Sequence, residues 1–213
     1  AWCEKVGFVG PDIWVAHGRE TQPEEYDFMA QSGIGISHCP APTMYGGSEI
    51  LDIPGMKNAG IPISLGVDGC STNEGSNILD SIRLSYLMQT FLSKKRGGCP
   101  SPYDMIKTAT TEGAKMMGRP ELGELASGKA ADLFMIDVER LEYAGALHDP
   151  MSIIPKLGIT GNVWLTMIDG KVVYENDRLV GIDEEKLLAE AENVCTNVLR
   201  NKCISFSNYR NNQ

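Results

Sequence analysis

Three short apolar runs, each closed by a polar residue, constrain the fold of this chain more than any other feature. They occupy residues 13–16, 34–37 and 61–67, and they end at His17, His38 and Asp68. The runs are rich in β-branched residues and do not alternate with charged ones, which is typical of strands buried in a parallel sheet. The sequence therefore predicts three buried strands, each with a polar residue at its carboxyl end.

Segments with helical features follow the three runs in turn. They cover residues 23–31, 50–59 and 77–95. The first has a proline near its start and two glutamates in its first turn, as helix N-termini prefer, and the third repeats apolar residues at helical spacing. Strand and helix alternate, so we expect an α/β fold with a parallel sheet or an α/β barrel. Three such units cannot close an eight-stranded barrel.

The pattern changes after Gly97-Gly98. Short helices are expected at 101–109 and 112–117, an apolar strand within 129–138, and a final amphipathic helix at 183–200. Residues 163–168 and 171–174 flank Asp169-Gly170, a strong signal for a β-hairpin. The polar tail at 206–213 is expected to be frayed.

Composition excludes several classes of partner. The chain has 213 residues and a net charge of -9, and it has no Lys/Arg patch of the kind that binds nucleic acid. No apolar run reaches the ~18 residues of a membrane span. The six cysteines show no CxxC spacing, which argues against a thiolate zinc site and, at this size, against a disulfide scaffold. We expect a reducing, cytoplasmic setting with no membrane partner.

The three strand-end residues are candidates for chemistry. In α/β barrels, reactive residues lie at the carboxyl ends of the strands, and two imidazoles with a carboxylate suit a metal such as Zn²⁺. A structural interpretation competes with this one. A single histidine is commonly just a satisfied polar group, and an aspartate before glycine is commonly a turn former. Spacing alone leaves both interpretations of His17, His38 and Asp68 open.

Several motifs carry a family resemblance that covers about residues 2 to 195. They are Trp14-Val15-Ala16-His17, residues 33–40, Leu65-Gly66-Val67-Asp68-Gly69, Ala109-Thr110 with Gly113-Ala114, residues 118–123, Gly128-Lys129-Ala130-Ala131-Asp132 and His148-Asp149-Pro150. The sequence resembles the amidohydrolase superfamily, in the aminohydrolase branch that includes 8-oxoguanine, guanine and isoxanthopterin deaminases and triazine hydrolases. The approach to His148-Asp149-Pro150 looks most like the 8-oxoguanine deaminases.

The resemblance implies a fold and its division. Residues 1–128 would form strands 6 to 8 of a (β/α)8 TIM-type barrel with the helices that follow them. Residues 129–182 would belong to a composite β-sandwich domain, and residues 183–213 would form a C-terminal helix and tail. The chain would thus be the C-terminal half of a metal-dependent hydrolase.

The resemblance also implies roles for particular residues. Asp68 would be a metal ligand that takes a proton from the attacking water, and His17 would hydrogen-bond that water or the tetrahedral intermediate. His38, Asn73 and Asn77 would shape the substrate pocket, although capping of a helix start is the alternative for both asparagines. Further pocket candidates are Cys39, Thr43, Tyr45 and Ser71. The implied cofactor is Zn²⁺, with Fe²⁺ as the alternative metal.

The implied reaction is hydrolysis of a carbon–nitrogen bond other than a peptide bond. It would deaminate a purine, a pterin or a related heterocycle such as 8-oxoguanine, and a triazine amino- or chlorohydrolase is the alternative. The implied partners are this small heterocycle, the N-terminal half of the same barrel and further copies in a homo-oligomer.

This sequence also departs from the family pattern. The family's HxH pair, fifth-strand histidine and HxxE glutamate are absent, since the histidines are His17, His38 and His148. A catalytically inert half-barrel is therefore a further alternative. Gly18-Arg19-Glu20 also stands where the family usually has a cysteine and an apolar stretch.

Overall fold

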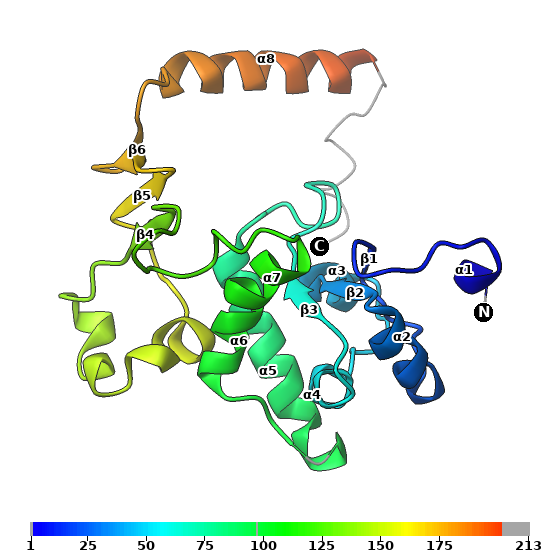
Figure 1. Ribbon diagram of the computed structural model, residues 1–213. Coiled ribbons are helices and arrows are strands. Elements are labelled where there is room, and N and C mark those ends of the chain that lie inside the picture. Colours follow the sequence, from blue (N-terminus) through cyan, green and yellow to red (C-terminus); the bar gives the residue numbers. More distant parts are fainter. Residues whose placement is uncertain (1, 97, 202–213) are drawn as a thin grey trace, which may run out of the picture.

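A parallel three-stranded sheet forms the centre of the molecule. The computed structural model describes residues 2–96 and 98–201. Strands β1 (Trp14–Ala16), β2 (Gly35–His38) and β3 (Ile63–Leu65) lie in that order (Figure 1). Both pairings are parallel, with Val15 opposite Ile36 and Ile36 opposite Ile63. The predicted strands and their parallel arrangement are confirmed.

Helices precede, connect and follow the strands of this sheet. In chain order they are α1 (Trp2–Lys5), the 3-10 turn η1 (Pro23–Glu25), α2 (Tyr26–Ser32), α3 (Pro40–Tyr45), α4 (Ile53–Asn58), α5 (Ile78–Arg96), α6 (Pro102–Ala109) and α7 (Thr111–Met116). The helix expected from residue 50 begins at Ile53, because the Asp52 side chain accepts a hydrogen bond from the Gly55 amide and caps the first turn. Helices α1 and α3 were not predicted.

One apolar cluster joins the sheet to these helices. Ile36 and Ile63 of the sheet are almost fully buried. They pack in a cluster with Ile53 and Met56 of α4, Leu79 and Ile82 of α5, and Met105 of α6. Alternation along β2 sends Ile36 to this face and Ser37 to the opposite one. The opposite face opens onto a cavity of about 800 Å³ whose lining includes Trp14, Ser37 and Ser64.

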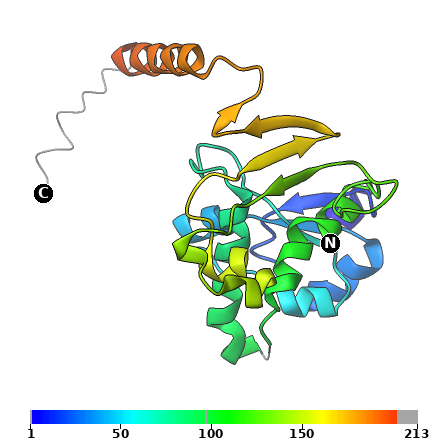
Figure 2. The same cartoon turned by 90° about the vertical axis from the view of Figure 1, so that its left-hand side faces the viewer.

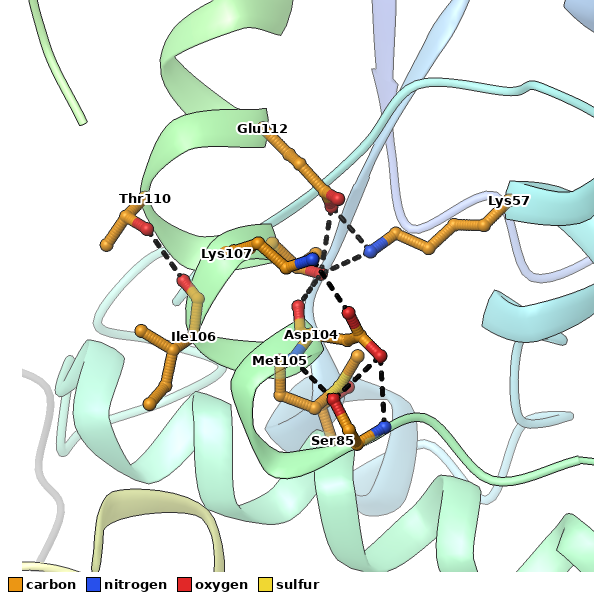
Figure 3. Close-up of polar contacts among 10 residues, drawn as sticks. Lys57, Ser85, Asp104, Met105, Ile106, Lys107, Thr110 and Glu112 are labelled. Atoms are coloured by element: carbon orange, nitrogen blue, oxygen red, sulfur yellow. Dashed lines mark hydrogen bonds and ion pairs between the residues drawn. The ribbon is translucent and has the colours of Figure 1, made fainter. Parts of the chain in front are cut away.

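A polar network ties α4 to α6 and α7 (Figure 3). Lys57 Nζ lies 2.8 Å from Thr108 Oγ1 and 2.5 Å from Glu112 Oε2. Asp104 and Ser101 form a capping box at the start of α6. The Lys107 ammonium, followed by Ser101, lowers the pKa of Asp104 to about 2. These contacts fix the two helices that follow the sheet against α4.

An antiparallel sheet follows in the second part of the chain. Its strands, in order, are β4 (Leu133–Met135), β5 (Leu165–Ile168), β6 (Lys171–Glu175) and β7 (Arg178–Leu179). The predicted hairpin is confirmed, and φ is 48° at Asp169 and 72° at Gly170, as a two-residue type I′ turn requires. Asp132 Oδ1 accepts a hydrogen bond from the Asp169 amide at 2.7 Å, which anchors that turn.

The remaining elements lie outside both sheets. Four short helical turns link β4 to β5: η2 (Leu141–Tyr143), η3 (Ala146–His148), η4 (Pro150–Ser152) and η5 (Ile153–Leu157). The last helix, α8 (Glu184–Asn201), lies apart from the three-stranded sheet in both views (Figures 1 and 2). None of the described helices combines the length and apolar character needed to cross a membrane. The expected frayed tail at 206–213 falls outside the described residues.

Candidate active site

His17 and Asp68 meet at the carboxyl end of the parallel sheet. His17 directly follows β1, and Asp68 lies just beyond β3. The distance from His17 Nε2 to Asp68 Oδ2 is 3.5 Å. Both residues have a left-handed backbone, with φ of 68° and 66°. That conformation costs a non-glycine residue about 1 kcal/mol or more and is concentrated at functional sites. The bend turns both side chains toward each other across the strand ends.

The environment of Asp68 favours its ionised form. Its Oδ1 accepts a hydrogen bond from the Gly69 amide at 2.7 Å. This amide, the Thr72 hydroxyl and the charge of His17 hold the pKa of Asp68 below its usual range, with the amide as the largest cause. The other oxygen, Oδ2, faces His17. Asp68 therefore offers a carboxylate oxygen that can bind a cation or accept a proton.

A cavity of about 590 Å³ opens beside this pair. It is lined by His17, Arg19, Pro42, Tyr45, Gly46, Asp68, Ser71, Thr72 and Glu74. A cavity of this size is large enough for a small heterocycle. Among the further pocket candidates, Tyr45 and Ser71 line it, whereas Cys39 and Thr43 are buried.

His38 ends β2, the strand between β1 and β3, and is fully buried. Neither of its ring nitrogens has a hydrogen-bond partner within the described part of the chain, and His17 Nδ1 also lacks one. Burial, followed by the nearby charge of His17, lowers the pKa of His38 to about 4. The imidazole of His38 is therefore neutral at pH 7.

The two asparagines after Asp68 make local contacts. Asn73 Nδ2 donates to the Val67 carbonyl at 2.9 Å and so ties the loop back to the end of β3. Asn77 Oδ1 accepts from the Leu79 amide at 3.0 Å, which is the helix-start capping weighed as the alternative. Contact of His38, Asn73 or Asn77 with a substrate stays a prediction.

The described residues supply only part of a metal site. Zinc takes three or four protein ligands, and no group of three His, Cys, Asp or Glu side chains within residues 2–96 and 98–201 is placed to hold a metal. Asp68 offers one carboxylate, and the His17 imidazole lies 3.5 Å from it. Asp68 therefore fits zinc as one member of a ligand set, and the described residues do not hold the metal alone.

Arg19 is a site residue that the sequence analysis did not select. Its side chain lines the cavity beside His17 and Asp68, and its Nη1 donates to Ser48 Oγ at 2.8 Å. The sequence signal that pointed to Arg19 was Gly18-Arg19-Glu20, which stands where the family usually has a cysteine and an apolar stretch.

Parallel strands followed by a histidine and an aspartate beside a cavity, with a small antiparallel sheet after them, are the arrangement of part of an α/β barrel with polar residues at its strand ends. The chain belongs to the amidohydrolase family, because the model described as "Amidohydrolase family" matches residues 1–173.

Curated relatives include several heterocycle hydrolases. Hydroxydechloroatrazine ethylaminohydrolase of Pseudomonas sp. (strain ADP) is 46% identical over 93% of this chain and 41% of its own length. The 8-oxoguanine deaminase of Pseudomonas aeruginosa is 37% identical over 72% of this chain and 33% of its own length. An isoxanthopterin deaminase from an unknown prokaryotic organism is 32% identical over 94% of this chain and 44% of its own length.

Solved structures agree with the fold. The zinc complex of atrazine chlorohydrolase TrzN from Arthrobacter aurescens TC1 has a TM-score of 0.80 and 30% identity over 88% of this chain and 41% of that chain. A zinc-bound adenosine deaminase from Xanthomonas campestris has a TM-score of 0.85 at 22% identity, over 92% of this chain and 44% of that chain, which supports the fold alone. The chain spans less than half the length of these relatives, and it corresponds to part of a TIM-barrel-type α/β fold.

Proposed function

We propose that this chain is part of a metal-dependent hydrolase that removes an amino group from a purine, a pterin or a related heterocycle such as 8-oxoguanine. The observation that carries the proposal is the approach of His17 to Asp68, at 3.5 Å, beside a cavity of about 590 Å³. A carboxylate and an imidazole at the strand ends are suited to activating water against a ring carbon.

Zinc is the proposed cofactor, with Fe²⁺ as the alternative metal. Two solved relatives with similar folds contain zinc. In this chain Asp68 would supply one ligand, and the remaining ligands would come from polypeptide outside the 213 residues. When bound, zinc lowers the pKa of water toward ~7 and so supplies hydroxide at neutral pH.

The residues of this chain then have separate tasks. Asp68 accepts the proton that the attacking water loses when its oxygen bonds to the amino-bearing ring carbon. His17 Nε2 donates a hydrogen bond to the attacking oxygen, while the electron pair of the ring carbon–nitrogen double bond moves to the ring nitrogen and returns when the amine departs. The proton held at Asp68 passes to the departing nitrogen, the carbon–nitrogen bond breaks, and ammonia leaves. The 3.5 Å contact with Asp68 orients His17 for this task.

A triazine is the second candidate substrate class. The relative with 46% identity is named as an ethylaminohydrolase of a hydroxylated triazine. The same chemistry serves both classes, because a purine and a triazine each present an amine on a carbon between ring nitrogens. The names of two relatives also specify an oxygen substituent, "hydroxy" in one and "oxo" in the other.

The domain assignment extends this proposal. Residues 1–128 would complete a barrel with an N-terminal half, residues 129–182 would form part of a composite β-sandwich, and residues 183–213 would form the C-terminal helix and tail. His38, Asn73 and Asn77 would shape the substrate pocket. We further propose a cytoplasmic homo-oligomer with neither a nucleic-acid nor a membrane partner. The inert half-barrel is the competing proposal, and it predicts no bound metal in the complete protein.

Two variants of the complete polypeptide that contains this chain test the function. Zinc content by mass spectrometry and ammonia release from 8-oxoguanine are measured for each. Asp68→Asn is expected to lose turnover and most of the metal. His17→Ala is expected to keep the metal and lose turnover by about 10²-fold, as for removal of a donor to a developing charge.

His148→Ala is the matched control, because His148 is exposed and lies outside the cavity lining. Full activity of the Asp68→Asn protein would refute the assignment. Loss of metal from the His17→Ala protein would instead make His17 a ligand.

A further inference from the structure

Arg19 forms no ion pair within the described part of the chain, although its charge helps to lower the pKa of Asp68. A guanidinium has five N–H donors, and one of them bonds to Ser48 Oγ at 2.8 Å. Two other arginines, Arg119 and Arg140, pair with glutamates close by in sequence. Arg19 forms no such pair among the described residues, although it lies in a pocket that also contains Asp68 and Glu74.

The position of Arg19 is fixed by its surroundings. The Ser48 hydroxyl accepts a hydrogen bond from Nη1 of the guanidinium. The guanidinium also packs closely against Gly46, because a Cβ added to that glycine would lie 3.3 Å from Nη1. Arg19 is half-buried and follows His17 by two residues. The same cavity therefore holds the reacting pair and a planar cation whose other N–H groups have no hydrogen-bond partner among the described residues.

The chemistry of a guanidinium limits what it can recognise. It donates hydrogen bonds and accepts none, and it binds planar oxygen acceptors with two parallel bonds. An exocyclic ring oxygen and the unprotonated ring nitrogen beside it present two such acceptors, more so when the oxygen is ionised. An exocyclic amine on the same ring is itself a hydrogen-bond donor, so it cannot accept a hydrogen bond from the guanidinium.

We infer that Arg19 determines specificity by binding an exocyclic oxygen of the substrate ring, so that the enzyme prefers oxo- or hydroxy-substituted amino-heterocycles. This inference rests on the proposed function and names the substrate class within it. Glu74 lines the same cavity and offers an acceptor for ring N–H groups. The two side chains together would fix which edge of the ring faces Asp68.

The expected discrimination is moderate. A fully buried polar site rejects an analogue that lacks its partner by about 10⁴-fold or more. Arg19 is only half-buried, so water can replace the missing oxygen. Loss of one charge-assisted hydrogen bond then changes affinity by about 10- to 100-fold.

Two pairs of ring compounds test whether binding depends on an exocyclic oxygen, independently of whether an amine is removed. Ammeline and melamine differ in one exocyclic group, an oxygen in the first and an amine in the second, and isoguanine and diaminopurine differ in the same way. The complete zinc-loaded enzyme is measured as wild type, Arg19→Met and Arg19→Lys, by kcat/KM and by calorimetric Kd for each compound. Arg83→Met is the control, because it removes an equal charge from α5, outside the cavity lining.

The wild type is expected to prefer the oxygen-bearing member of each pair. Arg19→Met should weaken its binding by about 10- to 100-fold while leaving the amine analogue unchanged. Arg19→Lys should fall between the two, because an ammonium lacks the planar pair of donors. Equal losses for both members of a pair, or no change, would overturn the inference.

The two proposals fail separately. If none of the compounds is hydrolysed but the Kd still depends on Arg19, the proposed function fails and the inference stands. If the compounds are hydrolysed but neither kcat/KM nor Kd depends on Arg19, the proposed function stands and the inference about Arg19 fails. Should Arg19→Met unfold, Ser48→Ala releases the guanidinium from its anchor and is expected to reduce the preference by about 3-fold, because the side chain must then be immobilised when the substrate binds. An unchanged preference in that variant would also count against the inference.

Discussion

The parallel-sheet region and the antiparallel-sheet region differ in how completely they bury their own apolar side chains. The main core cluster lies entirely between Met29 and Met105. Among the described residues beyond 129, the buried apolar side chains are Tyr143, Ile153 and Pro155, whereas Leu188 on α8 is 65% exposed. The first region therefore has its own core, and the second presents apolar surface that other polypeptide would have to cover. The larger size of the relatives agrees with that difference.

The largest expected effect is on the core of the first region. Ile36→Ala removes a fully buried side chain between β1 and β3 and should destabilise the chain by about 3 kcal/mol. Ile168→Ala on β5 is the matched substitution in the second region, where the side chain is 54% exposed. It should cost less than about 1 kcal/mol. Urea unfolding measures both, and equal losses would abolish the distinction between the regions.

The next effect is the loss of folding stability at acid pH, which we expect to depend on the buried His38 and not on the exposed His148. The pKa of His38 is about 4 in the folded protein against an ordinary 6.5, so the unfolded chain binds a proton first as the pH falls. The stability that depends on neutral His38 is therefore complete above pH 6.5 and is lost between 6.5 and 4. The loss over that window is on the order of 3 kcal/mol.

His38→Gln should flatten this part of the profile, measured by urea unfolding between pH 5 and 7. The exposed His148 gives the control, because His148→Gln should leave the slope unchanged. An unchanged slope in the His38→Gln protein would show that another group is responsible.

A smaller effect is expected at the polar network. Lys57 is 22% exposed and contacts Thr108 and Glu112, so Lys57→Met should cost about 1 to 2 kcal/mol. Lys186 on α8 is 72% exposed, and its pair with Glu190 spans 3.9 Å. Lys186→Met should therefore change stability by less than about 0.5 kcal/mol. Thermal unfolding of the two variants compares them, and the reverse order would contradict the network's role.

The smallest effect in this chain is expected on α8. Leu188→Ala should change the unfolding free energy by less than about 0.5 kcal/mol, because the side chain is mostly exposed. In the complete polypeptide the same substitution should cost about 2 kcal/mol if other polypeptide covers the helix. An equally small loss there would show that α8 stays exposed.

Much of the fold was predictable from local signals. The three parallel strands follow from apolar β-branched runs, α5 follows from its helical spacing, and the hairpin follows from Asp169-Gly170. Helix α3 was missed because it begins at Pro40 and is too short to show a period. The turns between Leu141 and Leu157 were missed for the same reason, since 3-10 and π turns have no apolar repeat to detect.

The candidate site was predictable only in part. His17 and Asp68 were chosen as strand-end residues, and their contact agrees with that choice. The capping role of Asn77 could be foreseen only as an alternative, because capping and pocket residues draw on the same polar types. Arg19 was noticed as a departure from the family pattern, but no local rule assigned it to the cavity.

The sequence by itself determined which segments contain strands, which polar residues lie at or after their ends and which family the motifs resemble, because those properties depend on composition and short-range order. The tertiary structure alone decided that His17 and Asp68 meet, that His38 is buried without a hydrogen-bond partner among the described residues and that Arg19 lines the cavity. Those facts depend on parallel pairing across β1, β2 and β3 and on the left-handed bends at His17 and Asp68. Neither pairing between distant segments nor the direction of a side chain after such a bend is set by neighbouring residues.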